Sequence, residues 1–232
     1  MRTAGAVSSG VMPEQHRRGL QNMTGEDVAG GTGYAAIILA AGAGRRFGGG
    51  KLLAPWRGAP LVSGALKTAL ATPSDQVVVV TGTDAAAVEE ACRAAAGPDA
   101  EIGRLRFLHA ADHEEGMGAS LRAGAASLAP GFKGVFVFLG DMPEIPPDII
   151  APLIAAVEAG APAAAPQYKG RRGHPVLFST EAAAGLAGAR GDAGARDILK
   201  QLGDQVARIP SPSPGVLFDV DRPGDLDRPF GD

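Results

Sequence analysis

Cysteine and aromatic residues are scarce in this sequence of 232 residues, which has a single cysteine, Cys92, and 5% aromatic residues. One cysteine excludes an internal disulfide, and without C-x-x-C pairs a structural zinc site is not expected either. We therefore expect a reducing, cytoplasmic environment. An excess of charge is also missing, since 22 Lys and Arg stand against 25 Asp and Glu, a formal net charge of -3. Without a global basic field we expect neither nucleic acid nor a membrane as partner, so any anionic ligand requires a local site.

Long apolar runs are missing as well. The longest uncharged stretches, such as 35–41 and 135–139, are far shorter than the roughly 20 residues of a membrane-spanning helix. Residues 1–33 contain no apolar core of signal-peptide length, so we expect a flexible N-terminal tail without a secretion signal, with Met23 as an alternative start. Residues 34–232 show neither a linker nor a repeat and are expected to form one domain.

Within that domain, short apolar or β-branched runs alternate with longer alanine-rich stretches. This alternation is typical of an α/β fold in which helices connect the strands of a mostly parallel sheet. Most of the runs are apolar on both faces, as strands covered by helices on each side must be. The predicted strands are 35–39, 76–81, 105–109, 134–139, 163–167, 175–178 and 206–209, and the predicted helices are 61–71, 85–96, 119–128, 147–159, 181–186 and 195–202.

A glycine-rich loop over residues 39–51 follows the first predicted strand and indicates a phosphate site. Small residues allow backbone N–H groups to close around an anion. The loop matches neither of two well-known phosphate motifs: a G-x-G-x-x-G dinucleotide motif would need glycine at Phe47, and a G-x-x-x-x-G-K-[ST] loop would need glycine at Arg45 and a hydroxyl at Leu52. What remains is a long loop whose two arginines and one lysine suit a triphosphate; the alternative is a solvated surface turn.

Aspartates end two other segments. Asp141 follows the apolar run 134–139, at the carboxyl end of a predicted strand, where open α/β sheets bind ligands. Asp219 and Asp221 alternate near the C-terminus. A purely structural role for Asp221 is to cap a last helical turn that begins near Pro223. Carboxylate and phosphate oxygens are the ligands that Mg²⁺ prefers, with Mn²⁺ as a substitute, so an aspartate such as Asp141 beside a triphosphate suits a divalent metal ion.

The same loop and five later segments together resemble the molybdenum cofactor cytidylyltransferase family, a branch of the MobA-like NTP transferases. The loop carries L-A-A-G-x-x-x-R-x-G-x-x-K, and the later segments are 116–121, 140–143, 173–178, 191–196 and 219–226, in family order. The resemblance covers about residues 34 to 227. It implies a three-layer α/β/α, Rossmann-like nucleotidyltransferase domain with a mostly parallel sheet.

The resemblance also implies roles for particular residues. The implied catalytic residues are Lys51, Arg45 and Asp141, and the implied metal ligands are Asp141 and Asp221. The implied nucleotide-binding residues are Leu39, Ala40, Ala41, Gly42, Gly44, Arg45, Lys51, Gly82, Gly118 and Ser120. The implied acceptor-substrate residues are Arg172, Gly173, His174, Asp192 and Arg196. His174 is equally compatible with a structural role, and Asp192 and Arg196 with a simple pair on one helix.

The predicted function is Mg²⁺-dependent transfer of CMP from CTP to a molybdenum-bound molybdopterin cofactor, with release of pyrophosphate. A phosphate nucleophile is already largely ionised at neutral pH, so no strong general base is needed, and none is evident. The L-A-A-G sequence resembles the cytidylyl branch, since the guanylyl branch usually has L-A-G-G. Guanylyl transfer and a sugar-phosphate acceptor remain alternatives, as do an NAD(P)-linked oxidoreductase and a pterin-cofactor chaperone, which would hand the cofactor to a recipient molybdoenzyme.

Two histidines suggest a metal site but lack support. His109 and His113 lie four residues apart beside acidic residues, without a third soft ligand. We expect this segment to be a solvated loop.

Overall fold

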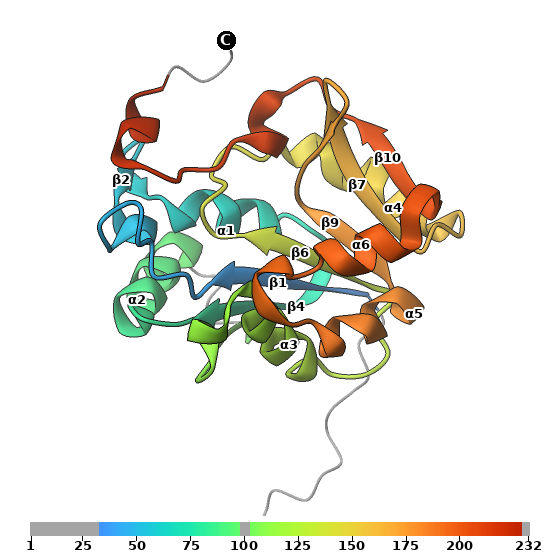
Figure 1. Cartoon of the computed structure of the whole chain (residues 1–232), viewed down its shortest axis with the longest axis horizontal. Helices are drawn as coiled ribbons and strands as arrows, with labels where there is room; N and C mark the ends of the chain where they lie inside the picture. Colours follow the sequence, from blue (N-terminus) through green and yellow to red (C-terminus); the bar gives the residue numbers. More distant parts are fainter. Residues whose placement is uncertain (1–32, 98–102, 229–232) are drawn as a thin grey trace, which may run out of the picture.

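The computed structural model describes residues 33–97 and 103–228 (Figure 1). The strands are β1 (Tyr34–Ala40), β2 (Pro55–Trp56), β3 (Ala59–Pro60), β4 (Ser74–Thr81), β5 (Leu105–His109), β6 (Gly134–Leu139), β7 (Ala163–Tyr168), β8 (Arg171–Arg172), β9 (Val176–Ser179) and β10 (Val206–Pro210). The helices are α1 (Val62–Leu70), α2 (Ala85–Ala96), α3 (Met117–Ala126), α4 (Ile150–Glu158), α5 (Thr180–Ala183) and α6 (Arg196–Leu202). Short 3₁₀ turns connect several of these elements.

One eight-stranded sheet forms the middle of the molecule. Its order is β10-β7-β9-β6-β1-β4-β5, with β8 paired to β7. β1 is parallel to both of its neighbours, β4 and β6, whereas β9 is antiparallel to β6 and β7. The chain leaves β1 toward β4 on one side and adds β6 later on the other, which creates a topological switch point at the carboxyl end of β1.

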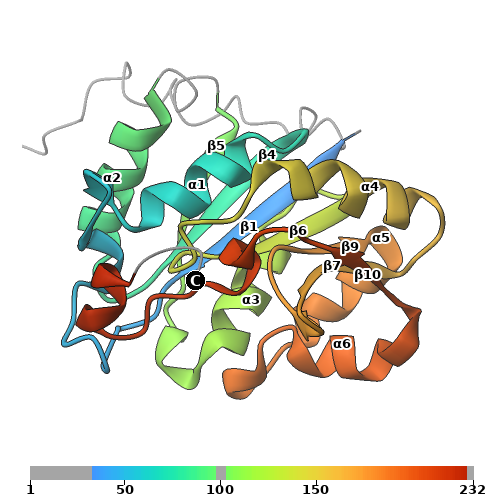
Figure 2. The same ribbon diagram turned by 90° about the horizontal axis from the view of Figure 1, so that it is seen from above.

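Helices cover both faces of this sheet (Figure 2). Alternate residues of the central strands enter opposite cores: Ile38 and Phe136 pack with α1, α2 and α4, whereas Ile37 and Val137 pack with α3 and α6. Because successive side chains of a strand point to opposite faces, strands covered on both sides must be apolar at nearly every position. The predicted three-layer α/β/α architecture and mostly parallel sheet are confirmed.

The observed elements follow the predicted ones closely, and helix α2 has its predicted bounds. Three differences remain. The predicted helix 147–159 begins with a 3₁₀ turn before α4. The predicted helix 181–186 is a short α5 followed by a 3₁₀ turn over Ala184–Gly188. Strands β2, β3 and β8 were not predicted, because two residues carry no periodic pattern.

Two further expectations bear on the ends of the domain and on membranes. The predicted tail 1–33 lies outside the described residues except for Gly33, whose N–H donates to Asp75 Oδ2 at 2.8 Å. The Gly33 carbonyl accepts a hydrogen bond from the Lys133 N–H at 2.8 Å. No helix within 33–97 and 103–228 is long and apolar enough to cross a bilayer.

Candidate functional site

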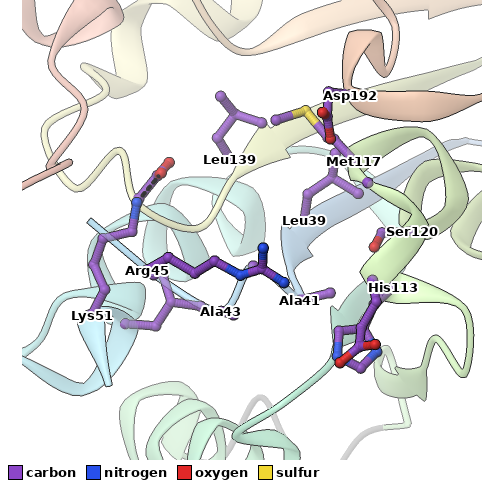
Figure 3. Close-up of a pocket in the computed structure, with 16 residues that line it drawn as sticks. Leu39, Ala41, Ala43, Arg45, Lys51, His113, Met117, Ser120, Leu139 and Asp192 are labelled. Carbon is purple, nitrogen blue, oxygen red and sulfur yellow. Dashed lines mark hydrogen bonds and ion pairs between the residues drawn. The ribbon is translucent and has the colours of Figure 1, made fainter. Parts of the chain in front are cut away.

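A cavity of about 460 Å³ opens at the carboxyl ends of β1 and β6 (Figure 3). Leu39 and Leu139 are register partners on these parallel strands, so the segments that follow them begin side by side. The lining residues come from the glycine-rich loop, from the start of α3 and from the turn before α6: Leu39, Ala41, Gly42, Ala43, Gly44, Arg45, Lys51, Leu52, His113, Glu114, Gly116, Met117, Ser120, Leu139, Asp141 and Asp192. The cavity therefore occupies the switch point of the sheet.

One end of the cavity brings Lys51 to two carboxylates from distant parts of the chain. Lys51 Nζ lies 2.7 Å from Asp141 Oδ2 and 3.7 Å from Asp221 Oδ1. The Lys51 and Asp141 side chains are 12% and 23% exposed, and that of Asp221 is 45% exposed. The structure thus gathers three of the predicted catalytic and metal residues at one point.

The loop geometry explains how Lys51 reaches this point. Gly44 has φ +56°, and its carbonyl accepts the N–H groups of Phe47, Gly48 and Gly49, which folds the loop back on itself. A side chain at Gly44 would meet Lys51 Cβ at 3.0 Å, so glycine allows the two segments to touch. The 3₁₀ turn Lys51–Leu53 then begins with Lys51 directed at the carboxylates.

The C-terminal segment supplies the second carboxylate. The Val220 N–H donates to the Asp141 carbonyl at 3.1 Å, which fixes residues 219–221 beside the end of β6. Asp225 Oδ2 accepts the N–H groups of Asp221 and Arg222, so Asp225 supports the last turn. The alternative that Asp221 caps this turn is therefore wrong: the turn starts after Arg222, and the Asp221 carboxylate faces Lys51 and Arg46.

A third acidic group, Asp219, lies nearby. Burial raises the pKa of Asp219, and the neighbouring Asp141 and Asp221 raise it further, while Lys51 lowers it. Asp219 therefore feels the charges of Asp141 and Asp221, while Lys51 pairs with both of these carboxylates and Arg46 pairs with Asp221.

This carboxylate end suits a hard cation. The donors are oxygen atoms, and an ammonium group already lies between two of them. In the described part of the chain, no three His, Cys, Asp or Glu residues converge as a complete metal centre. An ion such as Mg²⁺, which takes one or two protein carboxylates and completes its shell with phosphate and water oxygens, fits this pair. The predicted ligation by Asp141 and Asp221 stays a prediction.

Away from these carboxylates, the cavity is lined by small and apolar groups. Three of the residues predicted to bind the nucleotide, Leu39, Ala41 and Ser120, line it, whereas Ala40 is buried in the core; their contact with a nucleotide stays a prediction. Two predicted residues lie behind the wall: a side chain at Gly82 would meet the Ala41 carbonyl oxygen at 2.4 Å, and one at Gly118 would meet the Arg190 backbone at 2.4 Å. These glycines bring neighbouring segments close together.

His113 also belongs to this wall, within a segment in which His109, Glu114 and Glu115 are exposed. It begins a 3₁₀ turn and lines the cavity. Its Nδ1 donates to the Ala110 carbonyl at 2.9 Å, and its Nε2 lies 3.3 Å from Thr83 Oγ1. The acidic neighbours Asp112 and Glu115 pair with Arg122.

The predicted acceptor residues divide into two groups. Asp192 lies in the cavity itself, whereas Arg172, Gly173, His174 and Arg196 do not line it. Asp192 belongs to the 3₁₀ turn Gly191–Ala193 and Arg196 begins α6, and no ion pair joins them among the described residues. The alternative of a simple intrahelical pair is wrong.

His174 lies in the bend between β8 and β9, within electrostatic reach of Asp141. Burial lowers its pKa to about 4, although a hydrogen bond to the Val137 backbone and the charge of Asp141 act in the opposite direction. Its Nδ1 is buried without a hydrogen-bond partner in the described structure. A side chain at Gly173 would meet the Val216 carbonyl at 2.1 Å, so Gly173 permits the turn over Pro214–Leu217 to pack against this segment.

Arginines gather around this position. Burial lowers the pKa of Arg172, and the charges of Arg208 and Arg196 lower it further, so both of these guanidinium groups lie within electrostatic reach of Arg172. Arg208, on β10, was missed in the sequence because its neighbour Arg172 is 36 positions away. β10 and β8 both pair with β7, and this pairing brings the two arginines together.

Other residues of the site were also missed. Arg46 lies 3.2 Å from Asp221, and Met117 and Leu139 line the cavity. Arg46 was recognisable as a cation of the loop, but its partner is 175 positions away. Met117 lies in the segment 116–121 that carries the family resemblance, whereas Leu139 has no distinctive sequence signal, since a lone apolar residue at an element end usually belongs to a core.

Comparisons with known proteins agree with this geometry. Residues 36–206 match the family model described as the MobA-like NTP transferase domain. The chain is 33% identical to the purine catabolism protein PucB of Bacillus subtilis, over 82% of this chain and 93% of that protein. It is 35% identical to the nicotine blue oxidoreductase of Paenarthrobacter nicotinovorans, over 71% and 80% of the two chains. It is 28% identical to the molybdenum cofactor cytidylyltransferase of Escherichia coli, over 62% and 68%.

Solved structures with the same fold also match this chain. The crystal structure of Rv0371c from Mycobacterium tuberculosis superposes with a TM-score of 0.69 at 27% identity, covering 85% of this chain and 97% of that one. A second structure of that protein is a complex with manganese, with a TM-score of 0.66. The chain therefore belongs to the MobA-like NTP transferase family and is a nucleotidyltransferase.

Proposed function

We propose that this enzyme transfers CMP from CTP to the phosphate of a molybdopterin-type cofactor and releases pyrophosphate, with Mg²⁺ as the metal. The observation that carries the proposal is the meeting of Lys51 with Asp141 and Asp221 at one end of a cavity walled by the glycine-rich loop. The resemblance to the cytidylyl branch supports CTP through Ala41 in L-A-A-G. Guanylyl transfer and a sugar-phosphate acceptor are the nearest alternatives.

The metal would be held by Asp141 and Asp221. Enzymes of this family use divalent metals, and the Rv0371c structure with manganese supports the same use here. Nucleotidyl transfer brings an anionic nucleophile close to an anionic phosphorus centre, and each unit repulsion at 4 Å costs about 4 kcal/mol at an effective dielectric constant of 20. A bound divalent ion supplies charge neutralisation at this centre.

The triphosphate would lie along the glycine-rich loop. Arg45 points into the middle of the cavity (Figure 3) and is exposed, and it forms no ion pair within the described chain. An uncommitted guanidinium in a cavity suits bidentate binding of phosphate oxygens. Lys51, once released from Asp141, would hold the same phosphates.

The acceptor phosphate would approach from the side of His174. Arg172 and Arg196 form no ion pair with any residue of the described ranges, and Arg208 pairs only with the exposed Asp204. Because the positive charges of Arg172, Arg196 and Arg208 are not balanced by a buried carboxylate among the residues that the structure describes, a phosphate placed among these guanidinium groups would be stabilised. A phosphate monoester there is largely a dianion at pH 7 and can attack without a general base.

The experiment is a transfer assay with purified full-length protein, Mg²⁺, each labelled nucleoside triphosphate and the molybdenum cofactor. We expect pyrophosphate release and incorporation of CMP. Asp141→Asn should lower turnover by about 100-fold or more, the scale of losing charge stabilisation at the reacting centre. Asp148→Asn, an exposed aspartate that does not line the cavity, is the matched control and should be unchanged. Near-normal turnover of Asp141→Asn would remove this residue from the site.

A second candidate function is oxidoreduction, which the 35% identity to a nicotine blue oxidoreductase favours. The absence of G-x-G-x-x-G in the loop argues against a dinucleotide cofactor bound in the usual way. Incubation with NADH and NADPH in the presence of nicotine blue, the dye in the name of that relative, separates the two functions. Oxidation of the cofactor without incorporation of any nucleotide would favour the oxidoreductase and contradict the transferase.

A further inference from the structure

One wall of the cavity is apolar. Met117 is 42% exposed, and it is the one exposed large hydrophobic residue within 33–97 and 103–228. It begins α3 and lines the cavity together with Leu39 and Leu139. Figure 3 shows the three side chains near one another on the same side of the cavity. A single exposed methionine needs no explanation, but three apolar side chains lining a polar cavity form a surface for a flat, apolar ligand face.

Asp192 lies at the edge of this surface. Its carboxylate is exposed and makes no hydrogen bond or ion pair with the rest of the described chain. A methyl group at Gly116 would come 2.4 Å from Asp192 Oδ1, so this glycine is what allows the carboxylate to lie beside the start of α3. An unpaired carboxylate next to apolar side chains is available to accept two N–H bonds from a ligand.

The position of Asp192 is built into the fold. The Arg190 backbone packs directly on Gly118, where a side chain would be 2.4 Å away. Arg122 of α3 donates to the Ala189 carbonyl at 3.1 Å and also pairs with Asp112 in the segment that carries His113. The Asp192 turn and the opposite cavity wall are therefore both attached to α3, which fixes the spacing between them.

A flat ring on this surface can satisfy both Asp192 oxygens only if it presents two adjacent N–H donors. Uracil offers one ring N–H between two carbonyls, and cytosine offers an amine beside an acceptor nitrogen. A 2-amino-4-oxo-pyrimidine ring has an amide N–H next to an amine and matches a carboxylate in bidentate fashion. From this match we infer that Met117 and Asp192 form a subsite for a 2-amino-4-oxo-pyrimidine ring, in which Met117 packs on the ring face and Asp192 binds its edge.

This inference rests on the proposed function, because it places the ring in the cavity that would hold the substrates. The ring could come from two sources: the pterin of the acceptor or the guanine of a nucleotide. Both carry the same edge, so probes that differ only in the 2-amino group test the subsite. Pterin against lumazine tests the acceptor source, and GTP against ITP tests the nucleotide source.

The experiment measures equilibrium binding to the full chain in Mg²⁺, by fluorescence for the pteridines and by calorimetry for the nucleotides. We expect wild type to prefer the 2-amino member of one pair by about tenfold, the scale of a hydrogen bond to a charged group. Asp192→Asn should reduce this preference to twofold or less. Met117→Ala should weaken both members of that pair equally, and Met117→Leu should restore them. Asp197→Asn, on the exposed face of α6, is the matched control.

The outcomes separate the subsite from the proposed function. A preference in the pterin pair assigns the subsite to the acceptor, and one in the nucleotide pair assigns it to a guanine base, which would overturn CTP as the substrate. If wild type binds no triphosphate but shows a pterin preference that Asp192→Asn removes, the proposed function fails and the subsite stands. The absence of a preference in both pairs, or a preference that persists in Asp192→Asn, overturns the subsite.

Discussion

Replacing Lys51 with methionine should increase the affinity of the ligand-free enzyme for a divalent metal ion. In the structure the Lys51 ammonium lies between Asp141 and Asp221, where the ion is proposed to bind. Metal binding therefore requires the ammonium to leave. Methionine fills a similar volume without charge, so the Lys51→Met variant removes this competition and leaves both carboxylates in place.

The distances give the size of the effect. At an effective dielectric constant of 20, the separations of 2.7 and 3.7 Å correspond to Coulomb energies of about 6 and 4 kcal/mol. Desolvation of the ammonium offsets much of this attraction, and the exposure of Asp221 screens its share further. A net competition of about 1 to 3 kcal/mol remains, which is roughly 5- to 150-fold in metal affinity.

The assay is calorimetric titration of Mn²⁺ without nucleotide, on wild type, Lys51→Met and Lys51→Arg. The arginine variant keeps the charge and should resemble wild type. Without metal, Lys51→Met should also unfold at a lower urea concentration, because its carboxylates repel each other, and Mn²⁺ should recover the loss. Equal or weaker Mn²⁺ binding by Lys51→Met would refute the overlap of the ammonium and metal positions.

Three other substitutions test the framework of the site. Wild type should lose about 2 to 3 kcal/mol of unfolding free energy between pH 7 and 4.5, because burial lowers the pKa of His174 to about 4 and the unfolded chain takes up the proton first. In urea titrations at the two pH values, the loss of stability in His174→Gln should be smaller than in wild type by about this amount. Equal losses in the two proteins would refute the role of His174. Val220→Ala should lower the free energy of unfolding by about 1 to 3 kcal/mol and weaken Mn²⁺ binding, since this fully buried side chain holds residues 219–221 beside Asp141. Unchanged urea unfolding and an unchanged Mn²⁺ titration would contradict this role of Val220. Gly118→Ala should lower the melting temperature despite its higher helix propensity, because the methyl group would press on the Arg190 backbone at 2.4 Å; a higher melting temperature would show that this contact yields.

Local patterns in the sequence were enough to predict the framework. β5 and β6 have their predicted bounds, because each is a short run with a uniform preference for buried, extended structure. The position of Asp141 beside the glycine-rich loop also followed from the sequence, since parallel strands deliver their carboxyl ends to one edge of a sheet. β8, with only two residues, forms because β7 lies beside it, and no window of sequence contains that information.

The site depends on contacts that the sequence could not supply. Lys51 and Asp141 are 90 positions apart, and Asp221 reaches them only because Val220 is buried and hydrogen-bonded at the end of β6. Asp192 was predicted for the acceptor side, and the packing of its turn on Gly116 and α3 is what places it in the cavity. Periodicity and loop chemistry thus determined which elements form and which edge of the sheet carries the cavity. The return path of the chain, fixed by side-chain packing across many residues, decided which charged groups meet there.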